Sequence, residues 1–144
     1  MLKTIRITRF LDGDAPFSCV IPTRFADVDW NGHINNVATA QIIEDARTRF
    51  TDRMGLLDPT GTDIRYLTAS FQVDYVGEAY YPEPYEVHAA VSAIGTASWS
   101  YILTARQNGR VVAAALSTQA GTKDGRAVPL PPAMQERLAQ FLID

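Results

Sequence analysis

One helical pattern followed by a long series of strand patterns limits the folds available to this chain. Apolar residues recur every three or four positions through residues 36–54, which predicts a helix whose buried stripe is Ile43, Ala46, Phe50, Met54 and Leu57. Alternating apolar and polar residues then predict strands at residues 71–75, 85–92, 98–104 and 110–120. Asn108-Gly109 is a strong signal for a tight hairpin before the last strand. One long helix among antiparallel strands indicates an α+β fold whose sheet curls around that helix.

Shorter segments complete this arrangement. A strand is expected over residues 17–27, and Pro22 restricts it to an edge or bulged position because proline cannot donate to a ladder. Residues 4–8 alternate and predict a short strand before it, while residues 132–142 are typical of an amphipathic helix. The chain has 144 residues and no linker-like stretch, which favours a single domain over residues 1–144.

Composition and charge exclude several classes of partner. The chain has 13 Lys and Arg residues against 16 Asp and Glu residues, so its net charge of -3 would not attract nucleic acid or an anionic membrane. No apolar stretch approaches the roughly 18 residues of a membrane span. Cys19 is the only cysteine and cannot close an intrachain disulfide, which favours a reducing compartment, the cytoplasm. Because His33, His88 and Cys19 lack the spacing of metal ligands, neither a metal nor another cofactor is expected.

The segment that carries most chemistry is RFADVDWNGHINN, residues 24–36. It concentrates two carboxylates, one histidine and three amides between a predicted strand and the start of the predicted helix. A carboxylate there can attack a carbonyl, or activate water to attack it, while N–H donors at a helix start receive the developing oxyanion. The same residue types are common in loops and caps, so composition alone leaves an acyl-transfer site and a structural loop as alternatives.

The longer stretch DVDWNGHINNVATAQIIEDAR resembles the signature of hotdog-fold thioesterases, a superfamily that includes 4-hydroxybenzoyl-CoA, acyl-CoA and acyl-ACP thioesterases. Members share an Asp-x-Asp-x-x-Gly-His-x-Asn-Asn stretch ahead of a long helix with Glu-x-Ala-Arg. The matching residues here are Asp27, Asp29, Gly32, His33, Asn35, Asn36, Glu44, Ala46 and Arg47. The resemblance extends from about residue 17 to the last helix. It implies the hotdog fold, an antiparallel sheet wrapped around one long central helix, and hydrolysis of acyl-CoA or acyl carrier protein thioesters.

The resemblance assigns the reaction to three residues of this loop. Asp29 matches the carboxylate that acts in the 4-hydroxybenzoyl-CoA branch, where it would serve as nucleophile through a mixed anhydride or as general base for water. Asn31 and His33 complete the Asp-x-Asn-x-His spacing of the acyl-ACP branch. Asn31 would orient Asp29 or the water, and His33 would either assist proton transfer or bond only to the backbone.

Further residues are expected around the acyl group. Backbone amides near Asn35, Asn36 and Val37 are the expected oxyanion donors, and Asn35 or Asn36 caps the helix, with Asn36 favoured. Thr39 stands where relatives often carry an aromatic residue, which predicts a wider or differently shaped acyl pocket. Asp74 lies roughly where several hotdog enzymes supply a second acid, although a polar residue on the outer face of a strand explains it as well.

Other charged residues have simpler interpretations. Asp27 is expected to lie in a turn or at a strand end. Glu44 and Arg47 are three positions apart and predict a local helix pair. Exposed cations are usually only solvated, but the candidates for contact with coenzyme A phosphates are Arg106, Lys123 and Arg126.

An apolar run at residues 111–116 covers both faces of its strand, which predicts either a central strand covered on both sides or burial of one face in a second subunit; we favour the second subunit. The resemblance likewise implies a homodimer or homotetramer with shared active sites.

Two alternatives to a thioesterase stay open: a non-catalytic module that binds acyl thioesters, and a hotdog hydratase or dehydratase. The second is disfavoured because the chain lacks a Gly-Asp-x-Asn-Pro-x-His motif.

Overall fold

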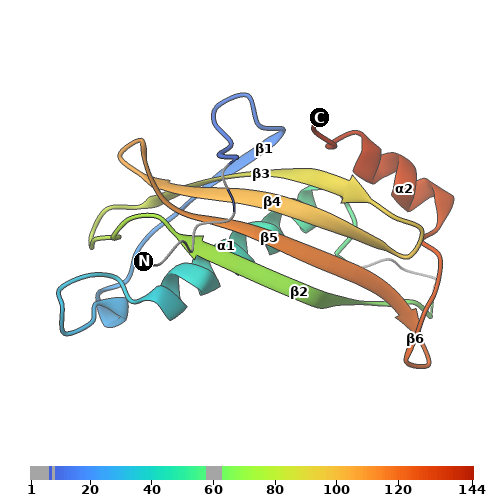
Figure 1. Cartoon of the computed structure of the whole chain (residues 1–144), viewed down its shortest axis with the longest axis horizontal. Coiled ribbons are helices and arrows are strands. Elements are labelled where there is room, and N and C mark those ends of the chain that lie inside the picture. The colour runs from blue at the N-terminus through green and yellow to red at the C-terminus, as the bar shows by residue number, and fades with distance from the viewer. Residues whose placement is uncertain (1–6, 8, 58–62) are drawn as a thin grey trace, which may run out of the picture.

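A six-stranded antiparallel sheet with a helix across one face makes up most of the residues that the structure describes (Figure 1). The structure is a computed structural model, and it describes residues 7, 9–57 and 63–144. The elements in chain order are β1 (Phe17–Ile21), the 3-10 turn η1 (Phe25–Asp27), α1 (Asn36–Arg53), β2 (Arg65–Tyr75), β3 (Tyr85–Ile94), β4 (Ser98–Gln107), β5 (Arg110–Lys123), β6 (Arg126–Ala127) and α2 (Pro132–Ala139). The strands lie in the order β1-β3-β4-β5-β2, so β1 and β2 are edges, and β6 pairs with β5.

The sheet confirms the predicted α+β class and most of the predicted strands. Asn108 and Gly109 have φ values of 50° and 75°, as a tight hairpin between β4 and β5 requires. The prediction that the first strand continues to residue 27 is wrong, because β1 ends just before Pro22 and η1 follows. The strand predicted at residues 4–8 lies almost wholly outside the described residues.

α1 begins where the sequence predicts, but it is shorter than the sheet. Its 18 residues span about 27 Å at 1.5 Å per residue, whereas the 14 residues of β5 extend about 46 Å at 3.3 Å per residue. α1 packs on β1, β3 and β4, and α2 joins the same core through Met134 and Leu138. The expectation of one long central helix is therefore corrected: two helices share this face. α2 also ends before Leu142, which instead pairs with Val91 at the edge of β3.

Phe50 lies at the centre of the core between α1 and the sheet. Its ring stacks on Phe17 of β1 with 4.9 Å between centroids. It also contacts the rings of Tyr101 at 5.3 Å and Phe141 at 5.4 Å. The predicted buried stripe is confirmed at Ile43, Ala46, Phe50 and Met54, and it is wrong at Leu57, which is exposed.

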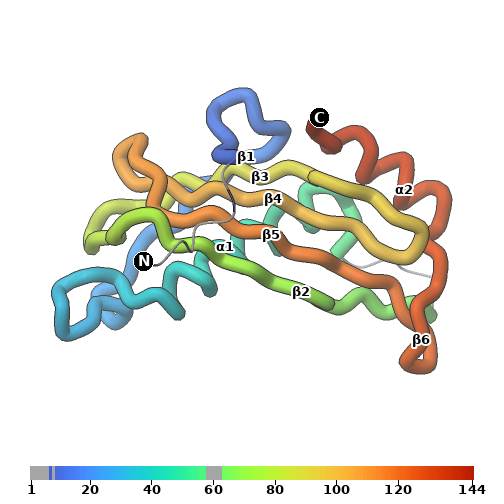
Figure 2. The backbone as a smooth tube through the Cα atoms, in the orientation of Figure 1, coloured from blue at the N-terminus to red at the C-terminus, as the bar shows by residue number. Residues whose placement is uncertain are grey.

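The second face of β5 is covered within the chain. The segment before β1 folds back beside β3 (Figure 2). Its Leu11 packs against Ala90, Ile102 and Leu116, and the Leu11 N–H donates to Thr104 Oγ1 at 2.8 Å. This part of the apolar run therefore requires no partner subunit to cover it.

Alkaline pH is expected to weaken the fold through two core tyrosines. Burial raises the pKa of Tyr101 and that of Tyr85. An unfolded tyrosine titrates near pH 10, so the stabilisation is complete below about pH 10 and is lost as pH rises through the higher native pKa. Urea unfolding at a series of pH values should show a shallower alkaline decline for Tyr101→Phe than for the wild type. Identical pH dependence of the two proteins would contradict this assignment.

Candidate active site

The motif between η1 and α1 folds into a tight loop. Val28 and Ile34 form an antiparallel bridge, and the Asp29 N–H donates to the His33 carbonyl at 2.8 Å. The Gly32 N–H closes the turn on the Asp29 carbonyl at 2.9 Å. Gly32 has a φ of 80°, a conformation that glycine adopts without strain. The loop thereby brings both of its ends to the start of α1.

The Asp29 carboxylate is held by the backbone of its own loop. Its Oδ1 accepts from the Asn31 N–H at 2.9 Å and from the His33 N–H at 3.4 Å. Within the described residues, no donor lies at hydrogen-bond distance from Oδ2. One carboxylate oxygen therefore fixes the side chain, and the other is available to a ligand.

Asn35 caps α1, so the prediction that favoured Asn36 as the cap is wrong. Asn35 Oδ1 accepts from the Ala38 N–H at 2.7 Å. Asn36 is the first helical residue, and its carbonyl accepts from the Tyr75 hydroxyl at 2.8 Å. In the described part of the chain, the N–H groups of Asn36 and Val37 donate to no protein acceptor. Such uncommitted donors at a helix start suit a developing negative charge.

A cavity of about 380 Å³ brings most of the predicted site residues together. One wall is the loop and the start of α1, and the other is the end of β2 with the residues that follow it. The lining residues are Asp29, Asn31, His33, Ile34, Asn36, Thr39, Tyr75, Val76, Gly77, Glu78 and Ala79. Thr39 is buried there, with its Oγ1 2.7 Å from the Tyr85 hydroxyl. Asn35 and Val37 flank the cavity without lining it.

Glu78 is a site residue that the sequence did not reveal. Its Oε2 lies 3.3 Å from His33 Nε2 and accepts from the Tyr80 hydroxyl at 2.7 Å. The rings of His33 and Tyr80 meet edge to face at 5.2 Å between centroids. Because the Glu78 side chain is 60% exposed, this acid holds His33 from the solvent side of the cavity.

Asp74, the predicted second acid, does not line this cavity. It pairs across the sheet with Ala114, in the row that continues to Thr104 and His88 on the face away from α1. It is buried, and its Oδ2 accepts from the Ile7 N–H at 2.6 Å. Asp74 therefore holds the segment before β1 against the sheet.

The other charged residues act mainly within the fold. Hydrogen bonds from Arg24 hold the pKa of Asp27 below its usual range, and Arg47 makes two bonds to Glu44, which confirms the predicted helix pair. Arg106 donates to the Leu11 carbonyl, so this cation is used to anchor the N-terminal segment.

The described residues contain neither a candidate metal site nor a candidate membrane span. No cluster of three or more His, Cys, Asp and Glu side chains there is arranged to hold a metal ion. No helix in that part of the chain has the length and hydropathy to cross a membrane.

Comparisons with known proteins agree with the loop motif. Residues 23–138 match the family model of the thioesterase-like superfamily. The structure of a predicted thioesterase from Bacillus stearothermophilus is 27% identical, covers 89% of this chain and 97% of its own, and has a TM-score of 0.79.

Two further solved structures are similar over most of their lengths. A thioesterase from Thermus thermophilus, complexed with coenzyme A and Zn, is 26% identical over 86% of this chain and 92% of its own, with a TM-score of 0.75. A Pseudomonas aeruginosa protein is 26% identical over 88% of this chain and 91% of its own, with a TM-score of 0.76. No curated protein matches the chain. The family model spans the loop, α1, nearly all of α2 and every strand except β1, and the chain belongs to the thioesterase-like superfamily.

Proposed function

We propose that this chain hydrolyses acyl thioesters of coenzyme A, that residues 1–144 act as one thioesterase domain, and that the Asp29 cavity is the active site. The observation that carries the proposal is the position of the Asp29 carboxylate in one cavity with the start of α1. A carboxylate and uncommitted helix N–H groups are the two functions that acyl transfer needs. The Thermus relative's complex with coenzyme A supports that carrier, and acyl carrier protein is the second candidate.

Hydrolysis by this site follows one of two balanced routes. As general base, Asp29 takes a proton from water, the hydroxide oxygen bonds to the carbonyl carbon, and the carbon–sulfur bond breaks to release a thiolate that recovers the proton. As nucleophile, Asp29 displaces the thiolate to form a mixed anhydride, which water then cleaves to the acid and free Asp29. In both routes the N–H groups of Asn36 and Val37 stabilise the oxyanion. Asn31 orients the water.

The test of this proposal is a thiol-release assay on purified protein with short, long, aromatic and β-keto acyl-CoA thioesters. We expect release well above the uncatalysed rate with at least one member of the panel. Binding of these thioesters without any release would contradict a hydrolase and favour the non-catalytic module. If the protein neither binds nor cleaves any coenzyme A or acyl carrier protein thioester, the hydrolase and the non-catalytic module are both contradicted.

His33 is expected to support the reaction rather than to carry it. His33→Ala should lower kcat by less than Asp29→Asn does, because the His33 imidazole pairs with Glu78 and a supporting group contributes less than the residue that attacks or takes the proton. Steady-state kinetics on the best substrate measure this difference, with Glu78→Gln as the companion variant that keeps His33 but removes its acidic partner. If His33→Ala loses as much kcat as Asp29→Asn, His33 is as important to the reaction as Asp29. If it loses none, the role of His33 is structural.

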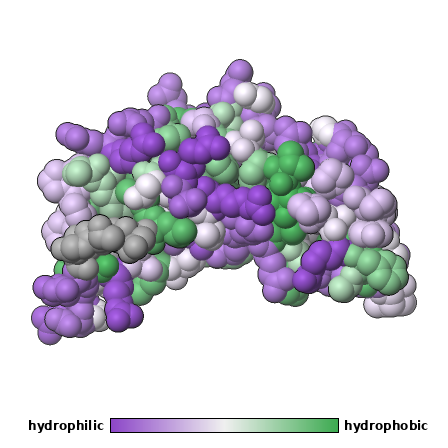
Figure 3. All heavy atoms as spheres, turned by 180° about the vertical axis from the view of Figure 1, so that it is seen from behind, coloured by the Kyte–Doolittle hydropathy of each residue, from purple (hydrophilic) through white to green (hydrophobic). Residues whose placement is uncertain are grey.

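We also propose a homodimer or homotetramer with sites shared between subunits. Among the described strands, the 11 residues of β2 form an edge of the sheet. Figure 3 shows the molecule from behind, hollowed along its lower side, where β2 lies in Figure 1. Around the Asp29 cavity, Trp30, Val37 and Tyr75 are 94%, 69% and 39% exposed. Exposed edges and apolar side chains of this kind favour pairing with another copy.

Light scattering after size exclusion tests this assembly. At micromolar concentration the mass should be at least twice the 15.9 kDa of one chain. A stable monomer that retains full activity would contradict both the interface and the shared site.

A further inference from the structure

Two buried threonine–tyrosine pairs join α1 to the sheet. Thr39 Oγ1 lies 2.7 Å from the hydroxyl of Tyr85 on β3. Thr51 Oγ1 lies 2.9 Å from the hydroxyl of Tyr101 on β4. Both tyrosines are inaccessible to solvent, and both threonines are buried. Because the two pairs have the same composition and lie on the same helix, a difference in their hydrogen bonds points to a difference in their roles.

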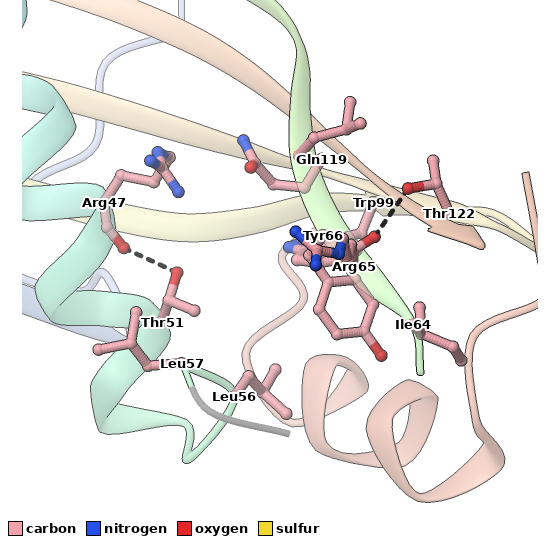
Figure 4. A pocket seen from close by; sticks show the side chains of 11 residues that line it. Arg47, Thr51, Leu56, Leu57, Ile64, Arg65, Tyr66, Trp99, Gln119 and Thr122 are labelled. Atoms are coloured by element: carbon pink, nitrogen blue, oxygen red, sulfur yellow. Dashed lines mark hydrogen bonds between the residues drawn. The ribbon is translucent and has the colours of Figure 1, made fainter. Parts of the chain in front are cut away.

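The Thr51 pair uses both of its hydroxyl hydrogens. Thr51 donates to the Arg47 carbonyl one helical turn back at 2.9 Å, as Figure 4 shows. Tyr101 must then donate to Thr51 Oγ1, because each hydroxyl has a single hydrogen. Within the described residues this pair needs no further partner, and its contribution to the fold accounts for it.

The Thr39 pair leaves one hydroxyl hydrogen without an acceptor. Thr48 and Thr51, the other threonines of α1, each donate to the carbonyl four positions earlier. The Thr39 hydroxyl makes no such bond in the described part of the chain. Its pair with Tyr85 contains two hydroxyl hydrogens, and only one can lie between the two oxygens. A buried donor without an acceptor is unfavourable, so the second hydrogen needs a ligand or a water.

The Asp29 cavity gives access to this hydrogen. Thr39 lines that cavity, whereas Tyr85 is fully buried and is absent from its lining. When Tyr85 donates to Thr39 Oγ1, the Thr39 hydroxyl can turn its own hydrogen toward the cavity. The acceptor that it meets there is an oxygen of the bound molecule.

The spacing along α1 indicates where this oxygen lies on the substrate. Thr39 comes three positions after Asn36, whose N–H is a proposed oxyanion donor, so about 4.5 Å of helix rise separates the two residues. Residues three positions apart are neighbours on one face of a helix. In an acyl thioester, the oxygens on carbons 1 and 3 span a similar distance when they point apart. An oxygen on carbon 3 therefore fits the Thr39 hydroxyl while the thioester oxygen faces the helix N–H groups.

We propose that Thr39 determines substrate specificity by donating a hydrogen bond to an oxygen on carbon 3 of the acyl group. The substrate class is then an acyl thioester with a hydroxyl or keto group on carbon 3. Tyr85 orients the Thr39 hydroxyl by donating to its oxygen. This inference rests on the proposed thioesterase activity, and it leaves the bond-making steps at Asp29.

The experiment compares hexanoyl-CoA with each enantiomer of 3-hydroxyhexanoyl-CoA, which differ from it by the oxygen on carbon 3. The measured quantity is the ratio of their kcat/KM values. We expect wild-type protein to prefer one 3-hydroxy enantiomer by about tenfold or more, as a site that bonds a substrate hydroxyl provides. Thr39→Val, which keeps the shape and removes the hydroxyl, should bring the ratio close to one. Thr39→Ser should retain the preference.

Thr51→Val is the matched control, because it makes the same chemical change in the second pair on the same helix. It also removes the partner of a buried tyrosine hydroxyl, so the two valine variants have a similar cost in stability. Because neither Thr51 nor Tyr101 lines the Asp29 cavity, Thr51→Val should leave the substrate ratio unchanged.

Two kinetic outcomes would overturn the inference. If Thr39→Val keeps the wild-type ratio, the second hydroxyl hydrogen serves only a bound water. If Thr51→Val lowers the ratio as much as Thr39→Val does, the effect comes from the fold and not from contact with the substrate.

A binding measurement separates this inference from the proposed activity and requires no variant. Its ligands are ketone analogues of the two thioesters, in which a methylene replaces the sulfur and prevents hydrolysis. Calorimetry with wild-type protein should show about tenfold tighter binding of the 3-hydroxy analogue. Tighter binding of that analogue, without hydrolysis of any thioester, would contradict the proposed function and leave the Thr39 contact in place. Hydrolysis with equal binding of the two analogues would contradict the Thr39 contact alone.

Discussion

Replacing Asp29 by asparagine is expected to lower kcat by about 10² to 10⁴-fold, the usual contribution of a general base. Asparagine keeps the Oδ1 acceptor that the N–H groups of Asn31 and His33 require, so the loop should keep its shape. It cannot take a proton from water or form an anhydride. The measurement is steady-state thiol release from the best substrate, with circular dichroism to verify the fold.

Asp27→Asn is the matched control, because it makes the same chemical change two positions away. Asp27 is engaged with Arg24 and does not line the Asp29 cavity, so its variant should keep a rate near that of the wild type. Equal rates for wild type and Asp29→Asn would remove Asp29 from the reaction.

Replacing Phe50 by alanine is expected to destabilise the fold by about 3–5 kcal/mol, the range for a fully buried aromatic residue. Phe50 is inaccessible to solvent and contacts rings from β1, β4 and the segment after α2. No neighbour can fill the space without leaving its own packing. Urea unfolding at one fixed protein concentration measures the change, since assembly would otherwise contribute to apparent stability.

Val20→Ala serves as the control for this substitution, since Val20 is an exposed residue of β1 and should contribute well under about 1 kcal/mol. A loss below about 1 kcal/mol for Phe50→Ala would show that α1 does not depend on this ring for its attachment to the sheet.

The sequence predicted those parts of the fold that depend on local patterns. The stripe through Ile43, Ala46 and Phe50 indicated the position of α1, because each residue repeats the same contact one turn later. The hairpin at Asn108-Gly109 is likewise a local backbone property. Asp124-Gly125 has the same positive φ values, yet β6 has only two residues and leaves no alternation to detect. The length of α1 relative to the sheet is a property of the assembled sheet and has no local signal.

The candidate site likewise has residues that a local sequence pattern predicts and residues that only the folded chain brings together. Asp29, Asn31 and His33 lie in one short loop, so a single segment predicts their proximity. Glu78 reaches His33 only because the chain after β2 returns to the loop, where the Ile34 N–H donates to the Ala79 carbonyl at 2.8 Å. Asp74 lies four positions before Glu78, and strand alternation directs its side chain to the sheet face away from α1. A cavity of about 510 Å³ at the other end of α1 takes its lining from α1, β2, β4 and β5, which are far apart in the chain, so no sequence window contains it.

The most direct test of the active site is a crystal structure of Asp29→Asn with an uncleaved acyl-CoA bound. We expect the thioester carbonyl carbon within contact distance of the side chain at position 29, with its oxygen toward the N–H groups of Asn36 and Val37. A thioester bound elsewhere, with the Asp29 cavity empty of substrate, would contradict the proposed active site.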